Sequence, residues 1–143
     1  MLASVASHRF FEHTGDFGVE LTAPTEESLL AELVPAFAAL LTGVEGVVEA
    51  RESVPVEVEG IDLSDLLVVL GNELLYRFEA EGFLAAELAV EELTETRLVG
   101  ALRGERYDPE RHPIARPAKA VTQHGVGVEA RDGELVARVI FDL

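Results

Sequence analysis

Cysteine and tryptophan do not occur in this chain of 143 residues, and aromatic residues make up only 6% of it. Without cysteine the chain can form neither a disulfide nor a thiolate metal site. It therefore suits a reducing compartment, and we expect a cytoplasmic protein. Because hydrophobic residues still amount to 48%, a substantial core can be buried. We expect that core to consist mainly of leucine, valine and alanine.

Basic residues are also scarce. The sequence holds 27 acidic and 11 basic residues, which gives a formal net charge of -16. A surface of that sign repels phosphate backbones, so we expect no direct binding of RNA or DNA by the chain alone. Cations and basic partner surfaces are favoured instead, although an acidic surface that serves only solubility would look the same.

Lys119 is the only lysine, beside ten arginines. A single lysine in such a sequence suggests a site that needs a compact ammonium in place of a planar guanidinium. The alternative is a salt bridge to a neighbouring glutamate, which is the more common role of a lone lysine.

Several functional classes lack their sequence signals. Residues 1–10 show no basic start followed by a long apolar run, and no uncharged stretch is long enough to span a bilayer. We therefore expect neither a signal peptide nor a membrane segment. There is no G-x-S-x-G motif and no P-loop, and the four histidines lack the spacing of a zinc site. We predict no catalytic residues and, from the length, a single domain over residues 1–143.

Hydrophobic periodicity predicts two helices among a larger number of strands. One helix is expected between Thr25 and Gly43 and the other between Asp62 and Gly82, because each pair supplies a polar N-cap and a glycine stop. Pro35 is expected to kink the first helix. The predicted strands cover residues 8–12, 17–22, 54–58, 84–93, 97–103, 118–130 and 135–141.

The helices and strands do not strictly alternate, which predicts an α+β fold. We expect a mainly antiparallel sheet with the two helices packed on one of its faces. Asp132 and Gly133 form a dipeptide typical of a tight hairpin between the last two strands. Residues 104–117 contain three prolines and are expected to form a loop.

Three segments together resemble the archease family. Residues 12–16 read E-H-T-G-D, where the family has E-H-T-A-D, and residues 72–76 read N-E-L-L-Y as in the family's helix. The third segment combines G-E at 104–105, R-H at 111–112 and K-A-V-T at 119–122. The chain ends in F-D-L, where the family ends in a hydrophobic residue, an aspartate and an aliphatic residue. The departures at Gly15, Gly71 and Pro35 remove no ionisable group.

This resemblance implies the archease fold and a specific role. Archeases are accessory proteins of RtcB-type RNA ligases, which join RNA ends in tRNA splicing and RNA repair. They promote guanylylation of the ligase and its repeated turnover, and they bind a divalent metal, typically calcium. Some members of the family are described as chaperone-like partners of a tRNA methyltransferase. The resemblance therefore implies an activator protein and not an enzyme, with a metal-dependent phosphohydrolase as the rival interpretation.

Asp16 and Asp142 are the expected metal ligands, helped by the terminal carboxylate of Leu143. Two carboxylates supply the hard oxygen atoms that calcium or magnesium prefers. They can meet only if the strands near the two ends of the chain are neighbours in the sheet. The alternative is that Asp16 caps its turn and Asp142 is solvated. Asp62 is a further candidate for the metal or its support, although its role as a helix N-cap is favoured.

Four more residues are candidates for contact with the ligase. His13 could position the metal-binding turn or touch the partner, or it could hydrogen-bond only its own turn. Lys119 matches the lysine that is functionally important in the family. Glu105 and His112 are expected to line the same surface as Lys119.

Overall fold

The computed structural model describes residues 5–13 and 16–143, with the backbone alone at His13 and at residues 123–125. All of the predicted helices and strands are present, with ends that differ by a few residues. In chain order they are β1 (Ser7–His13), β2 (Asp16–Ala23), α1 (Glu26–Thr42), β3 (Glu52–Glu59), α2 (Leu63–Glu81), β4 (Phe83–Leu93), β5 (Arg97–Arg106), β6 (Ala120–Arg131) and β7 (Glu134–Asp142). None of the described helices has the length and apolar character needed to cross a lipid bilayer.

Both helices begin and end where the sequence predicts. The side chains of Thr25 and Asp62 each accept a hydrogen bond from a backbone N–H of the first helical turn. Gly43 and Gly82 adopt left-handed φ angles of 76° and 64° just beyond the last turns, a conformation that glycine reaches without a steric penalty. Helix α1 continues through Pro35.

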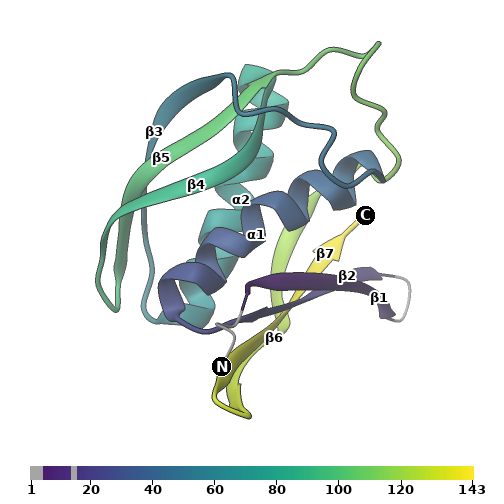
Figure 1. Cartoon of the computed structure of the whole chain (residues 1–143). Helices are drawn as coiled ribbons and strands as arrows, with labels where there is room; N and C mark the ends of the chain where they lie inside the picture. The colour runs from purple at the N-terminus through teal and green to yellow at the C-terminus, as the bar shows by residue number, and fades with distance from the viewer. Residues whose placement is uncertain (1–4, 14–15) are drawn as a thin grey trace.

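The strands form two antiparallel sheets instead of the single sheet expected. One sheet has four strands in the order β1-β2-β7-β6, and the other has three in the order β3-β5-β4. Each helix contacts strands of both sheets, so the helices form a layer between them (Figure 1). The α+β class and the antiparallel pairing are confirmed. The split into two sheets was not predicted because strand periodicity does not identify a strand's partner.

The position of α1 between the sheets explains its composition. A helix covered on several sides needs apolar residues around most of its circumference. Buried side chains occupy most positions from Leu29 to Thr42. Phe37, near the middle of this run, lies beside Phe141 of β7, with ring centroids 6.0 Å apart. Both rings are almost fully buried, which fixes the end of β7 against the core.

Strand β1 lies at the edge of the four-stranded sheet and is attached to α1 by His8. The Nδ1 atom of His8 lies 2.5 Å from a carboxylate oxygen of Glu32 on α1, and Nε2 lies 2.8 Å from Glu45 in the following loop. Carboxylates only accept hydrogen bonds, so both ring nitrogens donate and the ring is an imidazolium. Burial alone would lower the pKa of His8, but the two glutamates outweigh it and raise the pKa above 6.5.

This contact predicts a pH-dependent contribution to stability. In the unfolded chain His8 has its ordinary pKa of 6.5, and in the folded protein the pKa is higher. The stabilisation is therefore complete below pH 6.5 and is lost as the pH rises through the folded-state pKa. The substitution His8→Gln should lower the free energy of unfolding in acid and have a smaller effect in alkali. Urea unfolding of both chains over this pH range measures the difference. A loss that is the same at every pH would contradict the imidazolium.

Candidate functional site

Asp16 and Asp142 lie at opposed positions of the two central strands in the four-stranded sheet. The last pair of the ladder joins Phe17 to Phe141, and extending this register by one residue sets Asp16 opposite Asp142. Opposed residues in such strands have Cα atoms roughly 4.5–5.5 Å apart and side chains on the same face. Because Phe141 faces the core, the two aspartates face away from the helices. The start of β2 and the end of β7 therefore lie side by side in the sheet.

These two carboxylates have no protein partner among the described residues. Neither the side chain of Asp16 nor that of Asp142 takes part in an ion pair or hydrogen bond there, and Asp142 is exposed. Like charges at opposed strand positions repel each other, and a divalent cation between them would remove that repulsion. Leu143 follows directly and is an exposed residue.

The donor set fits a cation that prefers oxygen. No group of three or more acidic or histidine side chains suited to a metal occurs within the described part of the chain. A cation held by Asp16 and Asp142 would therefore complete its shell with main-chain oxygens and water. Calcium accepts such a shell, because it takes about 6–8 oxygen ligands in flexible geometry.

Lys119 lies at the same end of the sheet. Its backbone N–H donates to the carbonyl oxygen of Asp142 at 2.7 Å, just before Ala120 pairs with Asp142. The side chain is exposed, and within the described residues it has no carboxylate partner. The salt bridge considered as its simplest role is therefore not seen there. The backbone of Lys119 is thus fixed at the end of β7 beside Asp142.

Strand β1 also reaches this end of the sheet. His13 is the strand partner of Asp16. The predicted roles of the His13 side chain concern atoms outside those the structure describes, and the same holds for residues 14–15. The backbone alone places His13 in one row across the sheet with Asp16 and Asp142.

Asp62 does not belong to this group. It accepts the Asp65 backbone N–H at 2.8 Å as the N-cap of α2, and it lines a small hollow together with Val126. Asn72, ten residues further along α2, is the helix residue that contacts the start of β6. At about 1.5 Å per residue, Asp62 lies roughly 15 Å from that contact along the helix axis. The structure confirms Asp62 as the N-cap of α2, the role that the sequence favoured.

Glu105 and His112 are buried, which corrects the expectation that they touch a partner. Glu105 is 4% exposed and His112 is fully enclosed. Arg111 donates to both carboxylate oxygens of Glu105, and the Nε2 atom of His112 lies 3.0 Å from one of them. The backbone N–H of Glu49 donates to the same carboxylate at 2.7 Å. Side chains with so little free surface cannot contact another protein directly.

The pKa of Glu105 is lowered to about 2, chiefly by its hydrogen bond from the Arg111 guanidinium. Burial acts in the opposite direction and would raise this pKa. The His112 ring is oriented by a second bond, since its Nδ1 atom accepts the Asp108 backbone N–H at 2.9 Å. Nδ1 thus carries no proton, and Nε2 donates to Glu105. This network fixes the loop after β5.

The same loop is fastened again before it reaches Lys119. The backbone N–H of Ala115 donates to the carbonyl of Leu41 at 2.9 Å, at the C-terminal end of α1. The guanidinium of Arg116 donates to the carbonyl of Leu40 and lies 4.3 Å above the centre of the Phe17 ring. Two anchors therefore hold the loop that leads to Lys119.

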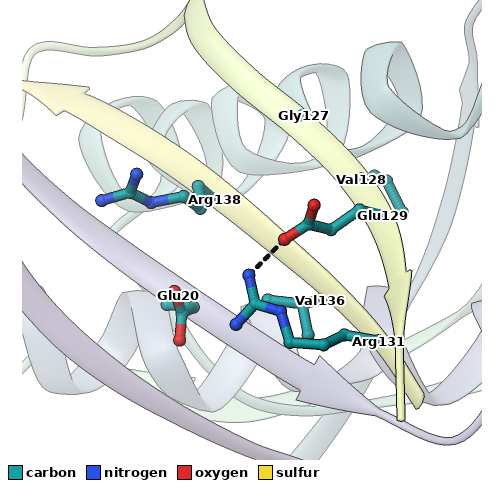
Figure 2. A pocket seen from close by; sticks show the side chains of 7 residues that line it. All are labelled: Glu20, Gly127, Val128, Glu129, Arg131, Val136 and Arg138. Carbon is teal, nitrogen blue, oxygen red and sulfur yellow. Dashed lines mark hydrogen bonds and ion pairs between the residues drawn. The ribbon is translucent and has the colours of Figure 1, made fainter. Parts of the chain in front are cut away.

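A separate hollow of about 360 Å³ lies on the outer face of the four-stranded sheet. Figure 2 shows Arg131 joined to Glu129, with Arg138 and Glu20 beside them. Arg138 also lies over the Phe11 ring at 4.3 Å. Glu20 and Arg138 are paired four residues along the strands from the aspartates, or roughly 13 Å. The hollow combines paired charges of both signs and includes no nucleophile among its lining residues.

Two residues of this end of the molecule were not recognised in the sequence as functional. Asn72 contacts the backbone of Val121, and Arg116 covers Phe17. The signal for Asn72 was available, because it is the only asparagine in the chain. Arg116 is one of ten arginines and carries no such signal.

Known proteins similar to this chain match it over almost its whole length. The profile of the archease protein family matches residues 8–143. Protein archease of Methanopyrus kandleri is 41% identical over 135 residues, which cover 92% of this chain and 96% of that protein. The solution structure of Methanobacterium thermoautotrophicum protein 1598 superposes with a TM-score of 0.76 at 28% identity and covers 95% of this chain and 98% of the other.

A crystal structure from Thermotoga maritima, described as an archease and possible chaperone, has a TM-score of 0.60. Its identity to this chain is 19%, with 93% of this chain and 94% of that chain covered. At this identity the likeness shows a shared fold.

The role of Asp62 can be tested by Asp62→Ala. Loss of an N-cap bond should lower the free energy of unfolding by about 1 kcal/mol. If Asp16 and Asp142 hold calcium, its affinity, measured by titration calorimetry, should stay within roughly twofold, because the start of α2 is remote from their strand ends. A folded variant that no longer binds calcium would show that Asp62 is a ligand after all.

Glu105→Gln tests the buried network. The ordinary pKa of 4.5 applies to the unfolded chain and about 2 to the folded one, so the carboxylate stabilises the fold above pH 4.5. That contribution disappears as the pH falls through the folded-state pKa. Near neutral pH the substitution should cost on the order of 2 kcal/mol, and the cost should shrink in acid. Urea unfolding against pH measures it, with the exposed Glu110→Gln in the same loop as the control. Equal effects of the two substitutions would contradict the network.

Proposed function

Because the chain belongs to the archease protein family, we propose that it is a metal-binding accessory protein of an RtcB-type RNA ligase. In this proposal it promotes guanylylation of the ligase and its turnover in tRNA splicing or RNA repair. The metal is calcium, held by Asp16, Asp142 and a main-chain oxygen of Leu143. The observation that supports the proposal most is that Asp16 and Asp142 follow the last pair of β2 and β7, with no side-chain partner in the described part of the chain.

Charge favours a protein partner over a nucleic acid. With a net charge of -16 the chain repels RNA, whereas an enzyme that binds RNA presents basic surface. An acidic accessory protein can approach such a surface and is steered towards it over distances of about a Debye length, near 8–10 Å in physiological salt. Lys119, which has no carboxylate partner among the residues described, would then reach an acidic group or a phosphate at the contact.

The cation would supply positive charge between the two aspartates and so hold the start of β2 beside the end of β7. The residues of this chain provide the rest: Phe17 and Phe141 orient the aspartates away from the core, and the carbonyl of Asp142 holds the backbone of Lys119. His13 lies in the same strand row. Docking would therefore present Lys119 and the metal site together, at a fixed separation.

Two other functions lead to different results. A metal-dependent phosphohydrolase would turn over substrate without a partner, so isolated chain with calcium, magnesium or manganese should then hydrolyse a phosphodiester. The T. maritima relative is described as a possible chaperone, and a chaperone-like modulator of a tRNA methyltransferase would stabilise that enzyme and leave the ligase unaffected.

Asp142→Asn provides the main test. It keeps the size of the side chain and removes its charge, so calcium affinity should fall by a factor of roughly ten or more, and stimulation of ligase guanylylation should fall with it. Calorimetric titration and a guanylylation assay with purified RtcB-type ligase measure the two effects. The matched control is Asp132→Asn in the turn before β7, where asparagine tolerates the φ of 52°.

The control should retain both calcium binding and stimulation. If Asp142→Asn also stimulated the ligase fully, the carboxylate pair would not be the functional site. If the unaltered chain neither bound calcium nor stimulated the ligase, the proposal as a whole would fail.

A further inference from the structure

The first residues of strand β6 have only a short stretch of regular pairing with their sheet. It is an edge strand, and only Ala120, Val121 and Thr122 pair regularly with β7 before the register shifts. Regular pairing resumes at Gly127. The backbone that follows Lys119 is therefore a paired stretch of three residues, interrupted on one side and open along its outer edge. Such a short ladder needs a second attachment to stay in place.

Asn72 provides that attachment. Its side-chain Nδ2 donates to the carbonyl of Val121 at 3.0 Å, and its Oδ1 accepts the Val121 backbone N–H at 2.9 Å. The amide thus satisfies both backbone groups of Val121 on the open edge, as a neighbouring strand would. An aspartate at this position could accept the Val121 N–H but would repel the Val121 carbonyl oxygen. Glutamine is one methylene longer.

Gly71 makes the contact sterically feasible. A Cβ atom at this position would lie 2.6 Å from the Cγ2 atom of Val121, closer than two carbon atoms can approach. The absence of a side chain lets α2 come near enough to β6 for the Asn72 amide to reach the strand. Glycine inside a helix lowers stability by about 1 kcal/mol relative to alanine. The contact that this glycine allows between α2 and β6 offsets that loss.

The attachment lies next to the candidate site. Val121 is two residues beyond Lys119, whose N–H bonds to Asp142, and one residue beyond Ala120, the strand partner of Asp142. We propose that Asn72 is a positioning residue, which holds the 119–121 backbone in register so that Lys119 keeps a fixed place beside Asp16 and Asp142. Asn72 acts through Val121 and touches no ligand itself. The effect of Asn72 on metal and ligase binding rests on the proposed function. The contact between Asn72 and Val121 does not depend on it.

The geometry can be tested on the isolated chain by amide hydrogen exchange. Asn72→Ala removes both bonds, so exchange at Val121 and Lys119 should accelerate roughly tenfold or more relative to core amides such as Val139. Asn72→Asp keeps the acceptor for the N–H and should have a smaller effect at Val121. The matched control is Arg77→Ala. Arg77 also joins α2 to a strand edge, at the carbonyl of Pro55 on β3, and should leave β6 unaffected.

The functional consequence is measured with the same three variants. Asn72→Ala should weaken calcium binding roughly three- to tenfold and raise the concentration that half-saturates the ligase, with a smaller change in maximal stimulation. Arg77→Ala should change neither. If Val121 and Lys119 exchanged at their original rates in Asn72→Ala, the inference would be overturned. It would also be overturned if exchange accelerated while calcium affinity and half-saturation stayed within twofold.

Failure of the proposed function gives a different pattern. If the unaltered chain bound no calcium and did not stimulate the ligase, the metal site and the partner would be rejected. The exchange comparison would still decide whether Asn72 holds the segment that carries Lys119, because it needs neither metal nor ligase.

Discussion

The pairing of β2 with β7 is the contact on which the other features of this end of the molecule depend. It joins the second strand of the chain to the last one at the centre of a four-stranded sheet. Side chains alternate between the two faces of a strand. With Phe17 and Phe141 on the helix side, Asp16 and Asp142 must lie on the other side, at opposed positions. The aromatic residues thus determine where the carboxylates point.

The carboxylates Glu105 and Asp142 lie in two different environments. Glu105 is enclosed and bonded to Arg111, His112 and the backbone of Glu49, and its pKa falls to about 2. This full set of partners is typical of a structural carboxylate. Asp142 is exposed and has no side-chain partner within the described residues. The two carboxylates therefore differ in burial and in their side-chain partners among the described residues.

Helix α2 connects the two sheets through contacts with strand edges. Asn72 bonds to the open edge of β6, and Arg77 donates to the carbonyl of Pro55 on β3. Exposed strand edges can pair with other chains, so covering them also protects a small protein from association. Figure 1 shows α2 in this intermediate position. The helix therefore contributes polar contacts as well as the apolar surface that its periodicity predicted.

Local features were predicted well because their causes are local. The caps at Thr25 and Asp62, and the hairpin at Asp132, depend on residues a few positions apart. Features that depend on distant contacts were predicted less well. The burial of Glu105 and His112 could not be inferred, because charged residue types are usually exposed and their partners could not be identified. The same applies to the division of the strands into two sheets.

The sequence by itself determined the elements, their ends and order, the acidic charge and the resemblance that singled out Asp16, Asp142 and Lys119. These follow from periodicity, capping chemistry and composition, which act over short distances along the chain. Only the tertiary structure decided that the aspartates meet while Asp62 stays apart, and that Asn72 secures the strand after Lys119. Which strands become neighbours is set by the packing of the whole core, and no short segment contains that information.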